Sequence, residues 1–121
     1  MKKLSSLTIF FPFLNDEGTV SLAISQAYKI GKKLTNDLEV MAIIGGKSKD
    51  KTSQIIKQQK NKFKKLVIID KTNNWESYAV IKYGFNNATK DWIFYTDGDL
   101  QYNLNDLPKL VKNQLSTGAD V

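Results

Sequence analysis

The chain has 121 residues, of which 41% are hydrophobic and 25% charged, and its formal net charge is +6. This composition fits one globular domain, or one piece of a larger one, and argues against disorder. Cysteine and histidine are both absent, which excludes disulfides, thiolate chemistry, Cys/His zinc sites and imidazole general bases.

Apolar runs alternate with segments of helical periodicity along the chain. We predict strands over 7–11, 38–44, 66–69 and 92–95. The predicted helices alternate with them, over 17–33, 50–62, 75–88 and 106–117. Near-continuous apolar strands separated by helices predict an α/β fold with a mostly parallel sheet and helices on both faces. The order of the strands is not readable from this pattern. The helix over 75–88 is expected to bury Tyr78, Ile81, Phe85 and Ala88.

The positive charge is concentrated in one segment. All 18 basic residues are lysines, and 47–71 holds nine of them against Asp50 and Asp70, a balance of nine minus two, or +7. Such a patch attracts phosphates, nucleic acid or an anionic membrane surface, although a solvated lysine-rich face has the same composition. The absence of arginine argues against nucleic acid, because forked recognition of phosphates and bases is lost.

Ligands of parallel sheets bind outside the carboxyl ends of the strands. This rule selects the segments that follow the predicted strands, which are 12–17, 45–49, 70–74 and 97–101.

The last of these segments, Asp97-Gly98-Asp99-Leu100-Gln101, carries the strongest chemical signal. If it stays extended, the side chains of Asp97, Asp99 and Gln101 lie on one side, with Leu100 pointing into the core. Three oxygen donors in that arrangement suit Mg²⁺ or Mn²⁺. A polar turn with solvated aspartates is the alternative.

Several motifs in this order resemble the family 2 glycosyltransferases, and more narrowly the dolichol- or polyprenyl-phosphate sugar transferases. The most specific is the block from Trp92 to Tyr102 with its Asp-x-Asp-Leu-Gln pattern, followed by Asp106-Leu107-Pro108. Weaker matches are Pro12 with Asn15-Asp16-Glu17, the segment 48–52, and Asn74 with Gly84-Phe85 and Ala88.

The resemblance implies a Rossmann-like GT-A fold that binds a nucleotide-diphospho-sugar. Mg²⁺ or Mn²⁺ would be held by Asp97, Asp99 and Gln101. The nucleotide would lie against Pro12, Asn15, Asp16, Glu17, Gly45, Gly46 and Asp97. The implied reaction is transfer of a hexose, with inversion, from a UDP- or GDP-sugar to a polyprenyl phosphate or a glycan. The expected setting is the cytoplasmic face of a membrane, with no nucleic-acid partner.

The sequence also departs from the family pattern. The family's second loop usually reads Asp-Asp-Gly-Ser and contacts the base through an aspartate, whereas this chain has Gly45-Gly46-Lys47-Ser48. The first-loop tyrosine is Leu14, and the usual Asn-Arg-Gly reads Asn74-Trp75-Glu76. We expect that an aspartate restored at Gly45 or Gly46 strengthens nucleoside binding.

Residues 1–121 are expected to form one truncated nucleotide-binding domain without the acceptor-side half, so the catalytic residues of that half are unassigned. The isolated chain is therefore expected to lack transfer activity. A non-catalytic or remnant nucleotide-binding module of a longer transferase remains the alternative. A phosphatase of the haloacid-dehalogenase type is disfavoured, because its Asp-x-Asp follows the first strand and needs further motifs downstream.

Overall fold

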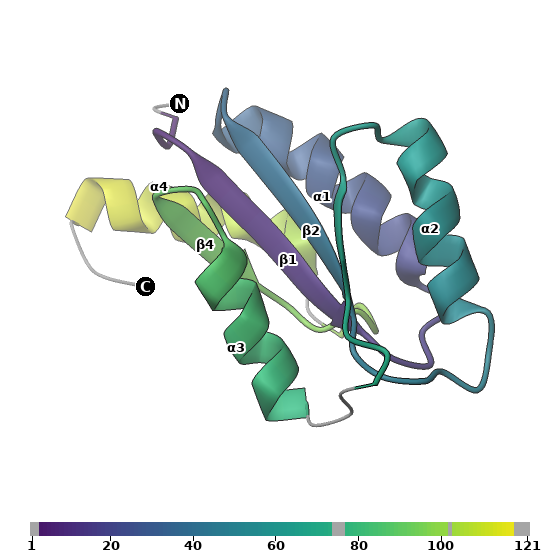
Figure 1. The fold of residues 1–121 in the computed structure, drawn as a ribbon. Helices are drawn as coiled ribbons and strands as arrows, with labels where there is room; N and C mark the ends of the chain where they lie inside the picture. Colours follow the sequence, from purple (N-terminus) through teal and green to yellow (C-terminus); the bar gives the residue numbers. More distant parts are fainter. Residues whose placement is uncertain (1–2, 74–76, 102, 118–121) are drawn as a thin grey trace.

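The computed structural model describes residues 3–73, 77–101 and 103–117. In these residues the chain alternates between strands and helices, as predicted (Figure 1). The elements are β1 (Leu7–Phe13), α1 (Val20–Leu34), β2 (Leu38–Ile44), α2 (Thr52–Lys62), β3 (Val67–Asp70), α3 (Ser77–Asn87), β4 (Trp92–Tyr95), the 3-10 helix η1 (Leu104–Asp106) and α4 (Leu107–Thr117).

The four strands form one parallel sheet in the order β3-β2-β1-β4. The central strand β1 pairs with β2 on one side and β4 on the other, so that Phe10 lies between Met41 and Tyr95. The chain thus winds outward through β2 and β3, then crosses back to place β4 beside β1. This reversal makes the carboxyl ends of β1 and β4 a topological switch point, where ligands of open α/β sheets bind.

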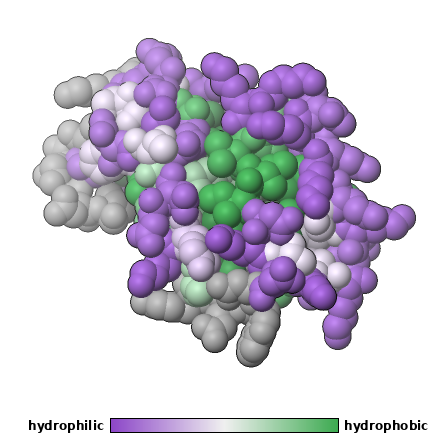
Figure 2. Space-filling model, viewed as in Figure 1, coloured by the Kyte–Doolittle hydropathy of each residue, from purple (hydrophilic) through white to green (hydrophobic). Residues whose placement is uncertain are grey.

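Helices cover both faces of the sheet, which confirms the predicted fold class. On one face α1 packs between α2 and α4, over the larger of the two hydrophobic clusters. On the other face α3 covers a smaller cluster of Phe10, Met41, Ile43 and Val80. Figure 2 views this second face and shows hydrophobic residues over the middle of the sheet, bordered by hydrophilic residues over α2. None of the described helices has the length and apolar character needed to cross a bilayer.

Strand β1 continues to Phe13, two residues beyond its predicted end, and includes Pro12. The backbone N–H groups of Trp92 and Thr96 donate to the carbonyls of Ser6 and Phe10, so even-numbered residues of β1 point their backbone groups toward β4. Since β4 pairs with β1 only as far as Phe10, Pro12 stands at a free edge on that side. A residue without an N–H is tolerated there.

The predicted inner stripe of α3 was wrong in part. Val80 is buried and Ile81 and Ala88 are half-buried, but Phe85 is 46% exposed. The cause is Gly84, which lies against Phe10 so closely that an added Cβ would be 2.1 Å from the ring. Val80 and Gly84, one turn apart, therefore face the sheet. The side chain of Tyr78 lies outside the described residues.

Candidate functional site

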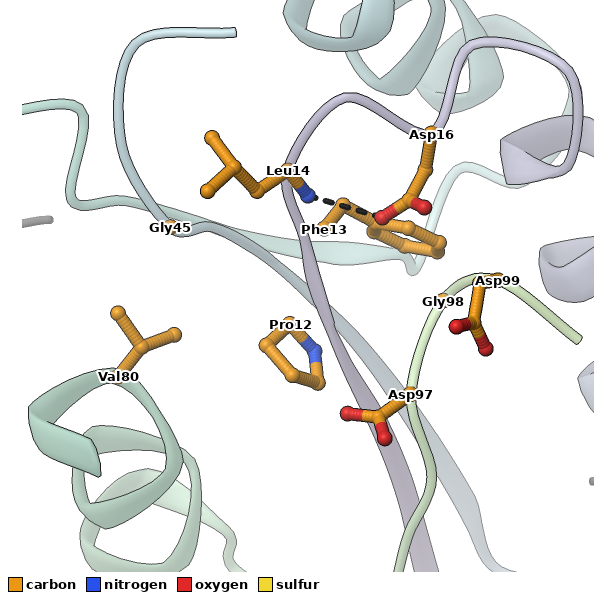
Figure 3. A pocket seen from close by; sticks show the side chains of 9 residues that line it. All are labelled: Pro12, Phe13, Leu14, Asp16, Gly45, Val80, Asp97, Gly98 and Asp99. Atoms are coloured by element: carbon orange, nitrogen blue, oxygen red, sulfur yellow. Dashed lines mark hydrogen bonds between the residues drawn. The ribbon is translucent and has the colours of Figure 1, made fainter. Parts of the chain in front are cut away.

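A pocket of about 210 Å³ opens where the carboxyl ends of β1, β2 and β4 meet, at the switch point. Its walls come from the first loop, the second loop, α3 and the Asp-x-Asp segment (Figure 3). The lining residues are Pro12, Phe13, Leu14, Asp16, Gly45, Val80, Asp97, Gly98 and Asp99. Asp16, Asp97 and Asp99 lie on one side of the pocket, across from Gly45 and Val80. Five of the predicted site residues are thus brought together: Pro12, Asp16, Gly45, Asp97 and Asp99.

Asp97 lies two residues after the end of β4 and is oriented by Tyr95, the strand's last residue. The hydroxyl of Tyr95 donates a hydrogen bond of 2.8 Å to Oδ1 of Asp97. Burial raises the pKa of Tyr95 to about 12, and the hydrogen bond to Asp97 acts in the same direction. The phenol therefore stays protonated at neutral pH and holds one carboxylate oxygen. The other oxygen remains available to a ligand.

The Asp-x-Asp segment is a turn rather than the extended strand that the side-chain alternation required. Gly98 and Asp99 form the turn, and Leu100 follows with a left-handed φ of 62°. The backbone N–H of Gln101 donates to Oδ1 of Asp99 at 3.1 Å, while its side chain is exposed and outside the pocket lining. Alternation therefore does not place Gln101 beside the two aspartates. Leu100 does pack against the core, as expected.

Gly98 explains why the chain turns at this point. A Cβ at Gly98 would lie 2.1 Å from Cδ1 of Phe13 and 3.1 Å from the carbonyl oxygen of Pro12. Glycine thus lets the backbone pass directly over the end of β1. The hydroxyl of Thr19 donates to the carbonyl oxygen of Gly98 at 2.5 Å, which ties the turn to the start of α1.

Asp16 is the carboxylate of the first loop that faces the pocket. It accepts a hydrogen bond of 2.9 Å from the backbone N–H of Leu14 (Figure 3). Burial raises the pKa of Asp16 despite this hydrogen bond, and the negative charges of Asp99, Asp50 and Asp97 raise it further. The site therefore concentrates negative charge that the fold does not neutralise.

The other acidic and amide groups of the first loop face the second loop. The side-chain oxygen of Asn15 accepts from the N–H of Lys49 at 2.7 Å, and Glu17 accepts from the N–H of Lys51 at 3.2 Å. Neither residue lines the pocket. Asn15 also has a left-handed φ of 55°, a conformation that asparagine tolerates better than most residues. Both residues position the two loops relative to each other, and their contact with the nucleotide stays a prediction.

Three side chains of segment 48–52 in turn accept hydrogen bonds from the backbone of the first loop. The sequence did not predict this role for them. The N–H groups of Asn15, Asp16 and Glu17 donate to the side chains of Ser48, Thr52 and Asp50, at 3.0, 2.7 and 3.1 Å. The two loops are therefore interlocked side by side. The Ser-x-Asp-x-Thr spacing is the signal that could have indicated this, since these short side chains commonly bind nearby backbone groups.

The two glycines of the second loop differ. Gly45 lines the pocket, and a Cβ there would meet Val80 at 3.4 Å, an ordinary contact. Gly46 is outside the lining and has a φ of 142°, which strains any residue with a side chain. Only Gly45 therefore offers a position for an added carboxylate. Val80 and Phe13 complete the pocket wall, and no sequence signal distinguished them from core residues.

The segment after β3 forms a separate pocket of about 770 Å³ between α2 and α3. Asp70, Lys71, Thr72 and Asn73 line it together with Ser53, Lys57 and Tyr83. Hydrogen bonds from Thr72 hold the pKa of Asp70 below its usual value, and Lys57 lies 3.8 Å from its carboxylate. Lys71 stacks over the Tyr83 ring at 4.0 Å. This pocket thus combines a carboxylate with ammonium groups, whereas the lining of the first pocket contains aspartates and no lysine.

The aspartates of the first pocket have no cationic partner among the described residues, whose ion pairs are Lys57–Asp70 and Lys90–Asp37. The same residues also contain no group of three acidic side chains placed to hold a metal ion unaided. A cation bound by Asp97 and Asp99 would have further coordination positions open to other ligands. Mg²⁺ commonly completes its coordination with water and phosphate oxygens around one or two carboxylates.

The sequence model of the Glycosyl transferase family 2 matches residues 8–121. The chain belongs to this family. The expected GT-A type of parallel α/β fold is confirmed by the sheet and its helices.

Relatives of this family 2 chain carry the name undecaprenyl-phosphate 4-deoxy-4-formamido-L-arabinose transferase. The one from Photorhabdus laumondii is 28% identical over 121 residues, which cover 99% of this chain and 37% of the relative. Those from Yersinia enterocolitica and Proteus mirabilis are 26% and 24% identical over 111 residues, or 91% of this chain and 34% of theirs. The chain thus spans little more than a third of the relatives' length.

Proposed function

We propose that this chain is the donor-binding part of a family 2 glycosyltransferase that transfers a sugar from a UDP- or GDP-sugar to a polyprenyl phosphate. The observation that carries the proposal is the pocket at the switch point, with Asp16, Asp97 and Asp99 on one wall and Gly45 opposite. An acidic wall repels a bare diphosphate. It suits a diphosphate that arrives with a divalent cation.

Asp97 and Asp99 would hold Mg²⁺ or Mn²⁺, and Tyr95 would keep the Asp97 carboxylate oriented. When bound, the cation supplies Lewis-acid stabilisation of the departing nucleoside diphosphate. Gln101 could join these metal ligands only if the turn rearranged, because its side chain is exposed and does not line the pocket. Pro12 and Val80 offer an apolar surface for the nucleoside.

The acceptor proposal rests on the relatives, whose names specify undecaprenyl phosphate, a polyprenyl phosphate. A phosphate acceptor is already nucleophilic, so it asks little general-base help from the protein. The same names specify a substituted arabinose, whereas the resemblance to the polyprenyl-phosphate sugar transferases implied a hexose. The candidate donors therefore include UDP- and GDP-hexoses together with a UDP-linked 4-formamido-arabinose. We place the reaction at the cytoplasmic face of the membrane.

Calorimetry of residues 1–121 with UDP and GDP, with Mn²⁺ or with EDTA, tests the donor site. We expect binding that requires the cation and is lost in Asp99→Asn. The matched control is Asp106→Asn, which removes the same charge from an exposed residue outside the pocket lining. Equal binding by wild type and Asp99→Asn, with and without Mn²⁺, would refute the metal-dependent donor site.

A nucleotide-binding module without catalysis is the second candidate, and the residues Gly45-Gly46 favour it, since they leave the pocket without a second-loop carboxylate. Incubation of the chain with donor, Mn²⁺ and undecaprenyl phosphate tests whether these residues transfer sugar on their own. We expect no transfer by residues 1–121 alone. Turnover would show that this part of the chain is catalytically sufficient.

A further inference from the structure

The second loop and the start of α2 present lysines in a regular pattern. From Lys47 to Thr52 the odd positions are lysines, and all three are exposed, whereas the even positions are turned inward. The inward side chains are Ser48, Asp50 and Thr52, which accept hydrogen bonds from the first loop. Lys47, Lys49 and Lys51 therefore project together from a segment that is fixed on its other side. We call these three residues the lysine rim.

The lysine rim borders the candidate donor pocket. Its backbone N–H groups at Lys49 and Lys51 donate to Asn15 and Glu17, which flank the pocket residue Asp16. The loop that carries the rim also contains Gly45, on the opposite wall of the same pocket. A surface that contacts the rim is thereby held beside the pocket.

Beyond the lysine rim, exposed lysines continue along α2. The buried residues of this helix are Thr52 and Ile56. The exposed lysines on and after the helix are Lys57, Lys60, Lys62, Lys64 and Lys65. Among the described residues one ion pair, Lys57–Asp70, involves any lysine of this segment. Figure 2 shows the hydrophilic surface that α2 and its loops form. The excess positive charge over 47–71 therefore faces solvent largely unpaired.

We propose that the lysine rim and the outer face of α2 dock this domain on the anionic phospholipid headgroups of a bilayer. The choice of a bilayer rests on the proposed function, because a polyprenyl-phosphate acceptor is embedded in one. Lysines attract an anionic leaflet at roughly 1 kcal/mol each near its surface. No exposed large hydrophobic side chain lies on the described segment 47–65. The docking is therefore electrostatic, reversible and weakened by salt.

Nucleic acid fits the same surface less well. The chain has no arginine for bidentate contacts to bases or phosphates. The region 47–65 also exposes no aromatic side chain on which bases could stack, since Phe63 is half-buried against Tyr28. What remains is unpaired point charge, which a continuous anionic surface matches best.

Co-sedimentation of residues 1–121 with vesicles tests the docking surface. Vesicles of phosphatidylcholine with about one third phosphatidylglycerol, an anionic fraction that gives a negative surface potential, are compared with pure phosphatidylcholine at low and physiological salt. The test variant is K47Q/K49Q/K51Q. The matched control is K29Q/K32Q/K33Q, which replaces three exposed lysines of α1. Each variant lowers the formal net charge from +6 by three, to +3.

We expect wild type to bind the anionic vesicles only, and less at high salt. The rim variant is expected to lose on the order of 100-fold in vesicle affinity, and the control less than about fivefold. Equal losses in both variants would overturn the proposal, because net charge alone would then explain binding. No binding of wild type to anionic vesicles would overturn it too, as would tighter binding to a single-stranded oligonucleotide at the same phosphate concentration.

Two measurements keep this test separate from the donor site. Thermal unfolding shows whether the rim variant is folded, which we expect because its hydrogen-bonding side chains at 48, 50 and 52 are unchanged. UDP and GDP binding without vesicles reports the donor site alone. If nucleotides fail to bind while vesicle binding still depends on the rim, the donor proposal falls and the docking surface stands. The reverse result rejects the docking surface alone.

Discussion

The two sides of the sheet's carboxyl edge carry opposite charge and are built differently. On the β1–β4 side, hydrogen bonds from the Leu14 N–H and the Tyr95 hydroxyl hold the carboxylates of Asp16 and Asp97. Gly98 is packed against Phe13. On the β2–α2 side, the lysines project into solvent from a segment whose other side chains provide the attachment. On the acidic side, the surrounding contacts fix the positions of the carboxylates. On the basic side, the fold provides the positive charge but does not fix the positions of the lysine side chains.

The two sides are therefore expected to respond differently to substitution. Burial raises the pKa of Asp16, and the charges of Asp99 and Asp97 raise it further, so single changes among these carboxylates have specific effects. Exposed lysines act through a summed potential that salt screens over about 8 Å at physiological ionic strength. Loss of one lysine is therefore partly compensated by its neighbours. Substitutions on each side test whether this contrast holds.

The largest effect is expected from Asp99→Asn, which keeps the shape of the acidic turn but removes one charge. Its amide oxygen still accepts the N–H of Gln101, so the fold should persist. Loss of a charged ligand is expected to weaken Mn²⁺-dependent UDP or GDP binding on the order of 100-fold. Calorimetry measures this, with Gln101→Ala alongside. An equal loss in Gln101→Ala would place that side chain with the cation after all.

The next effect is on stability and comes from Gly98→Ala. The added Cβ would overlap the Phe13 ring at 2.1 Å, and relieving such overpacking costs about 1–3 kcal/mol. Chemical denaturation measures the free energy of unfolding. Gly18→Ala serves as the control, because no atom lies within 4 Å of its added Cβ. If both variants unfold alike, the acidic turn is not held by close packing on β1.

Gly45→Asp extends the acidic side to the opposite wall of the pocket. The Cβ is accommodated beside Val80 at 3.4 Å, and a new hydrogen bond to the nucleoside could add about 1–2 kcal/mol of binding. Titration with UDP and GDP measures the gain. Gly46→Asp should instead destabilise the fold, since the φ of Gly46 is 142°. Unchanged affinity in Gly45→Asp for both nucleotides would mean that this loop does not contact the base.

The smallest effect is a pH-dependent change in stability from Asp16→Asn. Burial raises the pKa of Asp16 above 3.8, so its favourable contribution is present below that pH and is lost as pH rises through the folded-state value. The asparagine variant, which still accepts the Leu14 N–H, should melt above wild type at neutral pH and lose this advantage in acid. Thermal melts across pH test it. Asp50→Asn should behave oppositely, because hydrogen bonds from Thr52 lower the pKa of Asp50.

The sequence predicted the elements and the edge of the sheet at which the site lies. Strand and helix periodicity marked each element, because burial imposes different repeats on the two. The position of β4 beside β1 was not predicted, since strand order depends on contacts between distant segments. It is that order, β3-β2-β1-β4, which brings Asp97 close to Asp16.

Within the candidate site, the sequence indicated which residues lie near the pocket better than it indicated which side chains face into it. Asp97 and Asp99 face the pocket as expected, but alternation failed at Gln101 because the turn at Gly98 and the left-handed Leu100 break the period of two. That turn follows from the contact between Gly98 and Phe13, which residues far apart in sequence create. The hydrogen bonds of Asn15 and Glu17 to the second loop were likewise not predicted, because their partners Lys49 and Lys51 are distant in sequence.

The anchoring of the acidic turn has a consequence for motion. Gly98 rests on the Phe13 ring and its carbonyl accepts from Thr19, so direct contacts join the turn to the end of β1 and the start of α1. If the proposed donor binds here, it meets carboxylates that are already in place, which lowers the ordering cost of binding. The opposite wall is tied to the same frame, because the backbone N–H of Gly45 donates to the carbonyl of Phe13 at 3.0 Å. Both walls of the pocket are thus fixed to the end of β1.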